Sequence, residues 1–388
     1  MPGYEVFGEE ERQAINELFE LNGGILFAHG FDALRKGVYR VREFEAAFAN
    51  KMGVPYAQAV SSCTAALRVA LAALGIKRGD EIIIPSFTFV ATAEAVIQSG
   101  ADLVIVDIDN TLNMDPLKID KTITTRTKAI IPVHMMGAPA DMEKILSIAD
   151  EHKLHVLEDA AQACGGTYKG KPLGTIGHLG AFSFDAGKVM ITGEGGMIAT
   201  SDKDLYINCR AYHDHGHEYS TTVSRGEEGA VGEGFNYRMT ELQGAIGIVQ
   251  LKKLDMIINK QRANKKKLMN LIKDIPFEFR RIIDDGELGD AIIFFLDSKQ
   301  QADKFVKKMK EEALGTKNVP DAMCWHFSKY WSHIFKKYGW YRDSYQTQWK
   351  QSSDILERAV ALPIMIKMTD GRIAEIGEKI IRIAKEIR

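Results

Sequence analysis

The sequence predicts an α/β protein whose core is a mostly parallel sheet, flanked by helices, with a smaller α+β domain after it. Two observations predict the sheet. Apolar, β-branched runs of strand length recur between residues 80 and 200, and segments with helical spacing separate several of them. Continuous apolar runs are typical of strands buried on both faces, which helices on the two sides of a parallel sheet achieve.

The expected strands cover residues 80–87, 102–109, 128–135, 155–162, 180–185 and 196–200, with one more at 56–61. Helical spacing predicts helices over 64–75, 92–100 and 141–153. From Thr240 one helical pattern continues to residue 275 without an evident cap. Strands at 277–281 and 290–297 and a helix over 298–312 follow it. We therefore expect a large domain over residues 1–250 and a small C-terminal α+β domain over 251–388.

Composition excludes several classes of function. The 388 residues are 45% apolar and 26% charged, which is enough to bury a large core. The formal net charge is −2 and no long basic block occurs, so we expect no nucleic-acid partner. The first residues lack the apolar segment of a signal peptide, and no window has the apolar length of a membrane span. We expect a cytoplasmic protein without a membrane partner.

The four cysteines, Cys63, Cys164, Cys209 and Cys324, are far apart in the sequence and form no CxxC pair. They are expected to be reduced thiols, because neither a zinc ribbon nor a redox pair has this spacing. The run from Cys324 to Trp349 contains four tryptophans, which we assign to the core and to a subunit interface, with a substrate pocket as the alternative.

A single lysine, Lys188, stands between an apolar run and a glycine cluster in AFSFDAGKVMITGEGGMIAT. Glycines allow a phosphate or a bulky cofactor to approach the backbone, because they have no Cβ. A P-loop is excluded, since six residues instead of four separate Gly180 from Gly187, and Val189 replaces the Ser or Thr after the lysine. A solvated surface lysine is the ordinary alternative.

Two further segments carry polar groups at the ends of expected strands. Ser61-Ser62-Cys63-Thr64 begins a helix, where such residues cap free amides and also form an anion site. Glu158 and Asp159 lie near the end of a buried strand, with Gln162 three residues later. The carboxyl ends of parallel strands hold ligands, although some acids there only cap or pair locally. A buried carboxylate needs a partner, and a protonated heterocyclic nitrogen is one.

The segment HDHGH places His213, His215 and His217 at alternate positions. On a strand the three imidazoles would share one face as possible metal ligands, which leaves a metal-binding protein as an alternative. The intervening glycine argues against an extended strand, and no further ligand cluster is evident, so we expect no metal.

Six motifs together resemble one family in order and spacing: SSCTAAL, GDEIIIPSFTFVATAEA, TKAIIPVHMMGAPADM, EDAAQACGG, FSFDAGKVMITGEGG and GFNYRMTELQGAIG. This is the DegT/DnrJ/EryC1/StrS family of pyridoxal phosphate (PLP)-dependent sugar aminotransferases, with the type I, aspartate-aminotransferase-like fold. By this resemblance Lys188 forms a Schiff base with PLP and then moves the proton during transamination. Asp159 matches the aspartate that pairs with the pyridinium nitrogen and keeps the ring an electron sink.

The resemblance also implies the remaining cofactor contacts. Phe89 matches the residue that stacks on the ring, and Gln162 the residue on its other face or at its phenolic oxygen. Cys63, Thr64 and Ser183 match the phosphate-binding positions, although many relatives have glycine at position 63. Asn236 matches an asparagine that reaches the phosphate from the neighbouring subunit, which implies a homodimer. Sugar dehydratases of the family usually carry histidine at the lysine position, so Lys188 favours transamination.

The amino donor implied by the resemblance is L-glutamate, and most relatives aminate a nucleotide-linked keto sugar. The start MPGYEVFGEEE, residues 31–45, the DHGH run and the Trp-rich tail are similar to members that aminate an octulosonate of lipopolysaccharide. The expected acceptor is therefore 8-oxo-3-deoxy-manno-octulosonate, a free acidic sugar. The candidates for binding its carboxylate are Arg35, Arg40, His215, His217 and Arg225. Solvated arginines, a nucleotide-linked acceptor and a non-catalytic PLP-binding regulator are the open alternatives.

Overall fold

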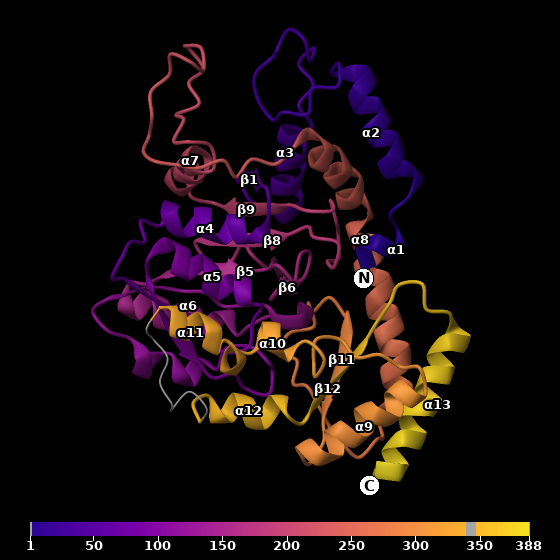
Figure 1. Ribbon diagram of the computed structural model, residues 1–388. Coiled ribbons are helices and arrows are strands. Elements are labelled where there is room, and N and C mark those ends of the chain that lie inside the picture. The colour runs from indigo at the N-terminus through magenta and orange to yellow at the C-terminus, as the bar shows by residue number, and fades with distance from the viewer. Residues whose placement is uncertain (1, 339–346, 388) are drawn as a thin grey trace.

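The computed structural model describes residues 2–338 and 347–387 and is built around a seven-stranded sheet with helices on both faces (Figure 1). The strand order is β1-β9-β8-β5-β4-β2-β3. The strands are β1 (Tyr56–Val60), β2 (Glu81–Pro85), β3 (Asp102–Val106), β4 (Thr127–Ile130), β5 (His155–Asp159), β8 (Leu179–Ser183) and β9 (Gly196–Thr200). Only β9 runs antiparallel to its neighbours, β8 and β1, so the predicted mostly parallel sheet is confirmed.

Every strand predicted for this sheet is present, and most end earlier than the apolar pattern does. The expected strand 155–162, for example, ends at Asp159. A two-stranded hairpin, β6 (Thr167–Tyr168) and β7 (Lys171–Pro172), lies between β5 and β8.

The helices of this part are α1 (Pro2–Glu5), α2 (Glu9–Leu21), α3 (Arg40–Met52), α4 (Cys63–Ala73), α5 (Val90–Ser99), α6 (Met142–His152) and α7 (Lys203–Tyr212). Short 3-10 turns occur at Pro116–Lys118, Asp120–Thr122, Met135–Gly137 and Ser328–Tyr330. Successive strand residues point to opposite faces, so Ile82 and Ile84 pack into a core with α4 and α5, whereas Ile83 packs into a core with α6. The helices therefore cover both faces.

One long helix, α8 (Glu241–Ile272), connects the large sheet to the C-terminal part (Figure 1). Near its start it packs closely on α3, where a Cβ on Gly247 would overlap the ring of Phe44. The expectation of no evident cap is wrong: the amide of Thr240 donates to Gln243 Oε1 at 2.8 Å, as in a capping box. The predicted boundary at residue 250 falls inside this helix and stays a prediction.

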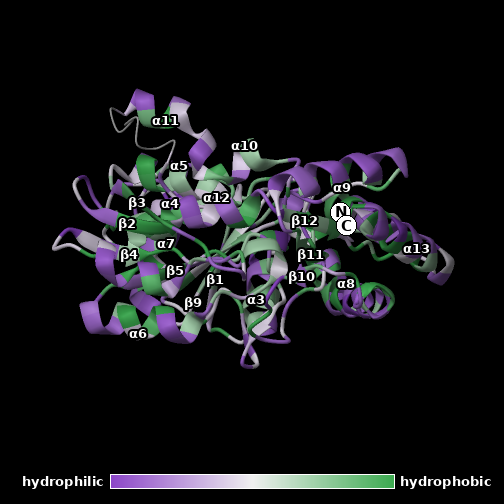
Figure 2. Ribbon diagram, turned by 90° about the horizontal axis from the view of Figure 1, so that it is seen from below, coloured by the Kyte–Doolittle hydropathy of each residue, from purple (hydrophilic) through white to green (hydrophobic). Residues whose placement is uncertain are grey.

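The C-terminal part contains a three-stranded antiparallel sheet, β10 (Glu278–Phe279), β11 (Ala291–Phe295) and β12 (Ala359–Pro363). Its helices are α9 (Lys299–Glu311), α10 (Met323–His326), α11 (Ser332–Lys337), α12 (Lys350–Leu356) and α13 (Asp370–Ile387). Apolar residues of α9, α13 and the end of α8 form one core with β11 and β12. Figure 2 shows the resulting amphipathic pattern, with α9 largely hydrophilic on the side that it shows.

The predicted tryptophan core is present in part. Trp331 and Trp349 are buried, Trp325 is exposed, and Trp340 lies outside the described residues. All four cysteines are free thiols. Within residues 2–338 and 347–387, we find no helix that combines the length and the apolar character needed to span a bilayer.

Candidate active site

A cavity of about 510 Å³ lies at the carboxyl ends of the central strands, the edge where open α/β sheets bind ligands. Strands β5 and β8 end there, and helices α4 and α5 begin there. Seven of the eight predicted cofactor-binding residues line it: Cys63, Thr64, Phe89, Asp159, Gln162, Ser183 and Lys188. Residues more than 100 positions apart in the sequence thus meet in one place.

Lys188 lies on the loop between β8 and β9, and its side chain is mostly buried. Its Nζ is 3.4 Å from Asp185 Oδ2, which makes a long ion pair. Lys188 is one of the residues that line the cavity. Packing requires one of the glycines that follow. A Cβ on Gly196 would lie 2.4 Å from the carbonyl oxygen of Ser62. Glycine there allows the start of β9 to approach the start of α4.

Asp159 is buried at the end of β5 and accepts two hydrogen bonds. Thr92 Oγ1 donates to Oδ2 at 2.7 Å, and the amide of Ala161 donates to Oδ1 at 3.1 Å. Burial raises the pKa of this carboxyl, while the two hydrogen bonds and the charge of Lys188 act in the opposite direction. No cation among the described residues forms an ion pair with Asp159, so a protonated ring nitrogen fits here.

The neighbouring Glu158 has a different role because successive strand residues face opposite sides of the sheet. Its carboxylate accepts hydrogen bonds from the amides of Gly174, Ile176 and Gly177, at 2.6 to 2.8 Å, and lies 2.9 Å from His134 Nε2. The fold therefore supplies hydrogen-bond partners for both carboxylate oxygens of Glu158. The strand pattern alone did not separate these two acids, whereas the family resemblance chose Asp159, which is the one that lines the cavity.

The start of α4 offers a site for an anion. Ser62 caps the helix by accepting from the amide of Ala65 at 3.1 Å. The amides of Cys63 and Thr64, in the first turn, have no intrahelical acceptor, and the helix dipole places positive charge beside them. Burial raises the pKa of the Cys63 thiol well above its ordinary value, so this side chain is uncharged. Capping by Ser62 therefore leaves these two amides free for an anion.

Aromatic and amide side chains line the same cavity. Phe89 is 44% exposed, and its ring lies 5.3 Å from the His326 ring at a tilted angle. Gln162 Oε1 accepts from the amide of Met136 at 3.0 Å, which fixes the orientation of its side-chain amide. An accessible ring, a buried carboxylate without a cation, a lysine and free helix amides fit the ring, the nitrogen, the aldehyde and the phosphate of PLP.

The C-terminal part also contributes to this cavity, which the sequence did not indicate. Asp290, Lys317, Asn318 and His326 line it, together with Pro2 and Glu194 from the large sheet's side. Lys317 forms an ion pair with Asp290. No sequence motif predicts that these residues line the cavity, because their position depends on how the small sheet packs on the large one.

The other predicted residues lie outside this cavity of the single chain. Arg35 is fully buried and pairs with Glu241 at 3.4 Å, and Arg40 pairs with Glu43 at 2.5 Å. The remaining candidates, His215, His217, Arg225 and Asn236, lie on the segment between α7 and α8. Asn236 is exposed there.

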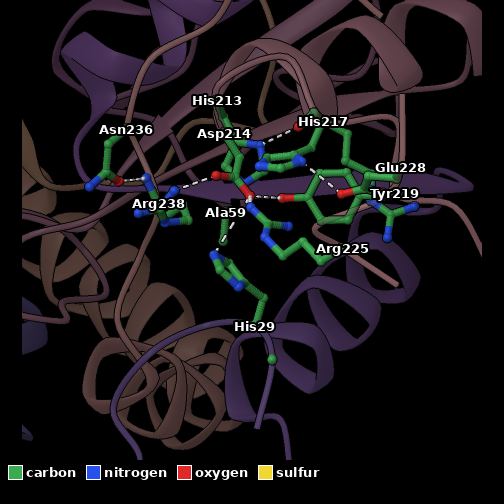
Figure 3. A network of polar contacts seen from close by, with 12 residues as sticks. His29, Ala59, His213, Asp214, His217, Tyr219, Arg225, Glu228, Asn236 and Arg238 are labelled. Atoms are coloured by element: carbon green, nitrogen blue, oxygen red, sulfur yellow. Dashed lines mark hydrogen bonds and ion pairs between the residues drawn. The ribbon is translucent and has the colours of Figure 1, made fainter. Parts of the chain in front are cut away.

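Figure 3 shows the polar network that orders this segment around Asp214, whose side chain is fully buried. Its carboxylate pairs with Arg225 and Arg238, and Tyr219 donates to it at 2.6 Å. Burial by itself would raise the pKa of Asp214, but these donors hold it well below its usual range. Asp214 is also bridged through the backbone to Asn236, so the network positions the predicted phosphate ligand.

The histidine segment does not form the strand that a metal site would need. His213 caps the end of α7, and His215 has a left-handed backbone, with φ of 55°. His213 Nδ1 donates to the carbonyl of Arg210 at 2.6 Å, and His217 pairs with Glu228 at 2.7 Å. Across the described ranges no group of three His, Cys, Asp or Glu side chains is arranged to hold a metal ion, so the metal-binding alternative has no support.

Comparison with known proteins gives matches over most of the chain. The model of the DegT/DnrJ/EryC1/StrS aminotransferase family matches residues 31–381. The spore coat polysaccharide biosynthesis protein SpsC of Bacillus subtilis is 35% identical over 394 residues, covering 98% of this chain and 96% of that protein. GDP-perosamine synthase of Caulobacter vibrioides is 48% identical over 218 residues, which cover 55% of this chain and 56% of that protein.

Solved structures show the same fold. An aminotransferase from Psychrobacter cryohalolentis superimposes with a TM-score of 0.87 at 29% identity, covering 98% of each chain. NtdA of Bacillus subtilis, solved with bound cofactor PMP, gives a TM-score of 0.82 at 25% identity, covering 99% of this chain and 84% of that one. These structures confirm the predicted PLP-dependent aminotransferase fold, and PLP is the cofactor that the Lys188 cavity fits.

Proposed function

Because this chain belongs to the DegT/DnrJ/EryC1/StrS aminotransferase family, we propose that it transfers the amino group of L-glutamate to the carbonyl of an oxidised sugar. One observation carries the proposal. A lysine, a buried carboxylate without a cationic partner and the free amides of a helix start share one cavity of about 510 Å³. This set of groups suits an amino transfer through PLP.

Bound PLP would supply an aldehyde for the amine and a ring that stabilises the negative charge left when the carbon next to the amine loses its proton. Lys188 Nζ would hold the aldehyde end of the cofactor and would supply and accept the proton at the reacting carbon. Asp159 keeps the ring nitrogen protonated. The amides of Cys63 and Thr64 and the hydroxyl of Ser183 bind the phosphate, and Phe89 covers the ring. The half-buried cavity limits the access of water.

The proposed acceptor is 8-oxo-3-deoxy-manno-octulosonate, giving 8-amino-3,8-dideoxy-manno-octulosonate for lipopolysaccharide. The similarity of residues 31–45 and of the DHGH run to octulosonate-aminating members supports it. Arg225 and Arg238 lie on the segment of Asn236. Each pairs with Asp214 through one guanidinium nitrogen, and we assign their other N–H groups to a substrate carboxylate. A nucleotide-linked keto sugar is the second candidate, favoured by the 48% identity to the Caulobacter GDP-perosamine synthase.

The active unit that we propose is a homodimer with shared sites, in which Asn236 completes the cavity of the partner. Asn236 is exposed and does not line the cavity of its own chain. Its segment also exposes Val223, Val231 and Phe235, and the facing segment 22–39 exposes Phe27 and other apolar side chains. Exposed apolar side chains on neighbouring segments are typical of a subunit interface.

The test of the activity uses the PLP-loaded enzyme with L-glutamate and each acceptor separately, and mass spectrometry of the sugar product. We expect amination of the octulosonate in the wild type and none with Lys188→Ala, whose circular dichroism should match the wild type. Amination of only a GDP-linked keto sugar would select the second candidate. A protein that binds PLP but aminates nothing and does not convert glutamate would be a regulator.

Mixing subunits tests the shared site. Lys188→Ala and Asn236→Ala each inactivate one component of a site, so heterodimers of the two variants contain one intact site if the components come from different chains. We expect partial recovery of activity in purified heterodimers. Verified heterodimers without any recovery would contradict the sharing.

A further inference from the structure

A second cavity, of about 320 Å³, lies at the free edge of β1, between α3 and α7. It shares no residue with the Lys188 cavity. Its polar wall comes from three elements and two connecting segments. The elements are α3, β1 and α7, and the segments are residues 22–39 and 213–240. The polar residues include Arg42, Glu45, Gln58, Tyr206, Arg210, His29, His213, Tyr219 and Arg238. The volume is in the range of sites for small metabolites.

Two arginines of this wall, the exposed Arg42 and the half-buried Arg210, have no protein acceptor among the described residues. The Arg42 guanidinium lies 3.8 Å from the centre of the Tyr39 ring, and that of Arg210 lies 4.1 Å from the centre of the Tyr219 ring. Neither guanidinium forms a hydrogen bond or an ion pair with any described residue. Ring faces hold the planar groups in place without using their N–H donors. Arg238, by contrast, is already paired with Asp214.

Among the described residues that line the cavity, Glu45 carries the one carboxyl group, and this group is only partly hydrogen-bonded. Glu45 Oε1 accepts from Gln58 Nε2 at 2.6 Å and from the amide of Ala59 at 2.8 Å. Glu45 Oε2 has no hydrogen-bond donor in the described part of the chain. Burial raises the pKa of Glu45 to about 7; the Ala59 amide and the charges of Arg210 and Arg42 oppose this, and Glu241 adds to it. The protonation of Glu45 therefore changes around neutral pH.

The two histidines of the wall are neutral at this pH. Burial lowers the pKa of His29 and of His213 to about 4. His213 donates through Nδ1 to the carbonyl of Arg210, so its Nε2 accepts from Gln58 Nε2 at 3.2 Å. His29 Nε2 is buried and forms no hydrogen bond, and it lies 3.8 Å from Asp214 Oδ2 (Figure 3). The tyrosines, Tyr206 and Tyr219, are also neutral, because burial raises their pKa values.

We propose that this cavity binds a small oxyanion, a carboxylate or a phosphate-type group, between Arg42 and Arg210. Guanidinium groups bind planar and tetrahedral oxyanions through paired N–H donors. The guanidinium groups of Arg42 and Arg210 have no protein acceptor among the described residues, so their donors are available to a ligand. His29 Nε2 and a protonated Glu45 Oε2 add further hydrogen-bonding positions. The cavity is a ligand site separate from the one that binds PLP.

Protonation of Glu45 is linked to binding. An ionised Glu45 repels the anion, so binding is strongest below pH 7 and weakens as the pH rises through the pKa of Glu45. With a pKa of about 7, the neutral fraction falls about tenfold between pH 6 and pH 8, and we expect a loss of affinity of up to that order. His29, His213 and the tyrosines do not change charge in this range.

The test is calorimetry of the PLP-saturated enzyme with sulfate, which keeps its charge between pH 6 and pH 8. We expect binding by the wild type and a loss of affinity of at least tenfold in Arg42→Gln and in Arg210→Gln. Arg78→Gln is the matched control, since Arg78 is exposed and lies outside the cavity. Succinate in the same titration distinguishes a carboxylate ligand from a phosphate-type one.

Glu45→Gln is expected to raise the affinity for the anion, which a misfolded variant would not do. At pH 8 this variant should bind the anion up to about tenfold more tightly than the wild type, and its affinity should not change between pH 6 and pH 8. Binding of neither sulfate nor succinate by the wild type would overturn the proposal. So would equal affinities in Arg42→Gln, Arg210→Gln and Arg78→Gln.

Discussion

Replacing Asp159 by Asn should impair catalysis without destabilising the fold. The charge-assisted hydrogen bond between this carboxylate and a protonated ring nitrogen is worth about 1.5–3 kcal/mol. If that energy is used in the transition state, its loss lowers kcat/KM by about 10- to 150-fold. Asn keeps the size of the side chain and, through its carbonyl oxygen, can still accept from the Thr92 hydroxyl, which lies 2.7 Å from Asp159 Oδ2.

Two effects on stability oppose each other. Burial raises the pKa of Asp159 above its value in the unfolded chain. The carboxyl therefore favours folding most below its unfolded pKa, and this contribution is lost as the pH rises through the folded pKa. At pH 7 the charged group opposes folding of the cofactor-free protein, and Asn removes that opposition, but the NH2 group of Asn cannot accept from the Ala161 amide. We expect Asp159→Asn without PLP to melt close to the wild-type temperature.

Two assays separate these effects: steady-state kinetics of glutamate conversion, and thermal unfolding without PLP. Thr92→Val is the matched control, because it removes one hydrogen bond from Asp159 and keeps the negative charge. It should lower kcat/KM only about fivefold, corresponding to roughly 1 kcal/mol. A large fall in melting temperature for Asp159→Asn, with kinetics close to those of the wild type, would refute the reasoning.

Other substitutions test the packing and the polar network. Asp214→Asn leaves two arginines unneutralised and should lower stability by about 3–5 kcal/mol, or about 4–6 °C in thermal unfolding. The exposed pair of Asp370 supplies the control, since Asp370→Asn should leave the melting temperature unchanged. The Asp214 penalty should shrink as the pH falls below 4, because its pKa is lowered. Gly180→Ala should prevent stable folding, since its Cβ would lie 1.9 Å from the carbonyl oxygen of Gly174, and soluble expression measures this.

The sequence was most informative where local pattern and burial coincide. The strands of the large sheet were predictable because strands buried on both faces carry continuous apolar runs. Their ends were not, since Ala160 to Ala163 are as apolar as a strand but form the turn after β5. The cap of α8 was readable from the Thr240 and Gln243 spacing, but the unusual length of the pattern obscured it.

The site was predictable only as far as motifs extend. Residues from Cys63 to Lys188 lie in motifs at strand ends, and the topology brings such ends together. Lys317 and His326 reach the same cavity through packing of the small sheet, for which no local pattern exists. Glu158 and Asp159 are adjacent acids whose roles differ only through the alternation of strand side chains. Arg35 is a residue type that often binds carboxylates, but here it is buried in an ion pair with Glu241.

The most direct test of the account is reductive trapping of the cofactor. The PLP-loaded enzyme is treated with borohydride, which fixes PLP on the lysine that holds it, and the peptides are then analysed by mass spectrometry. We expect one modification per chain, on Lys188. A modification mainly on Lys317, the other lysine that lines the cavity, or no stoichiometric modification at all, would contradict the central claim that Lys188 binds PLP.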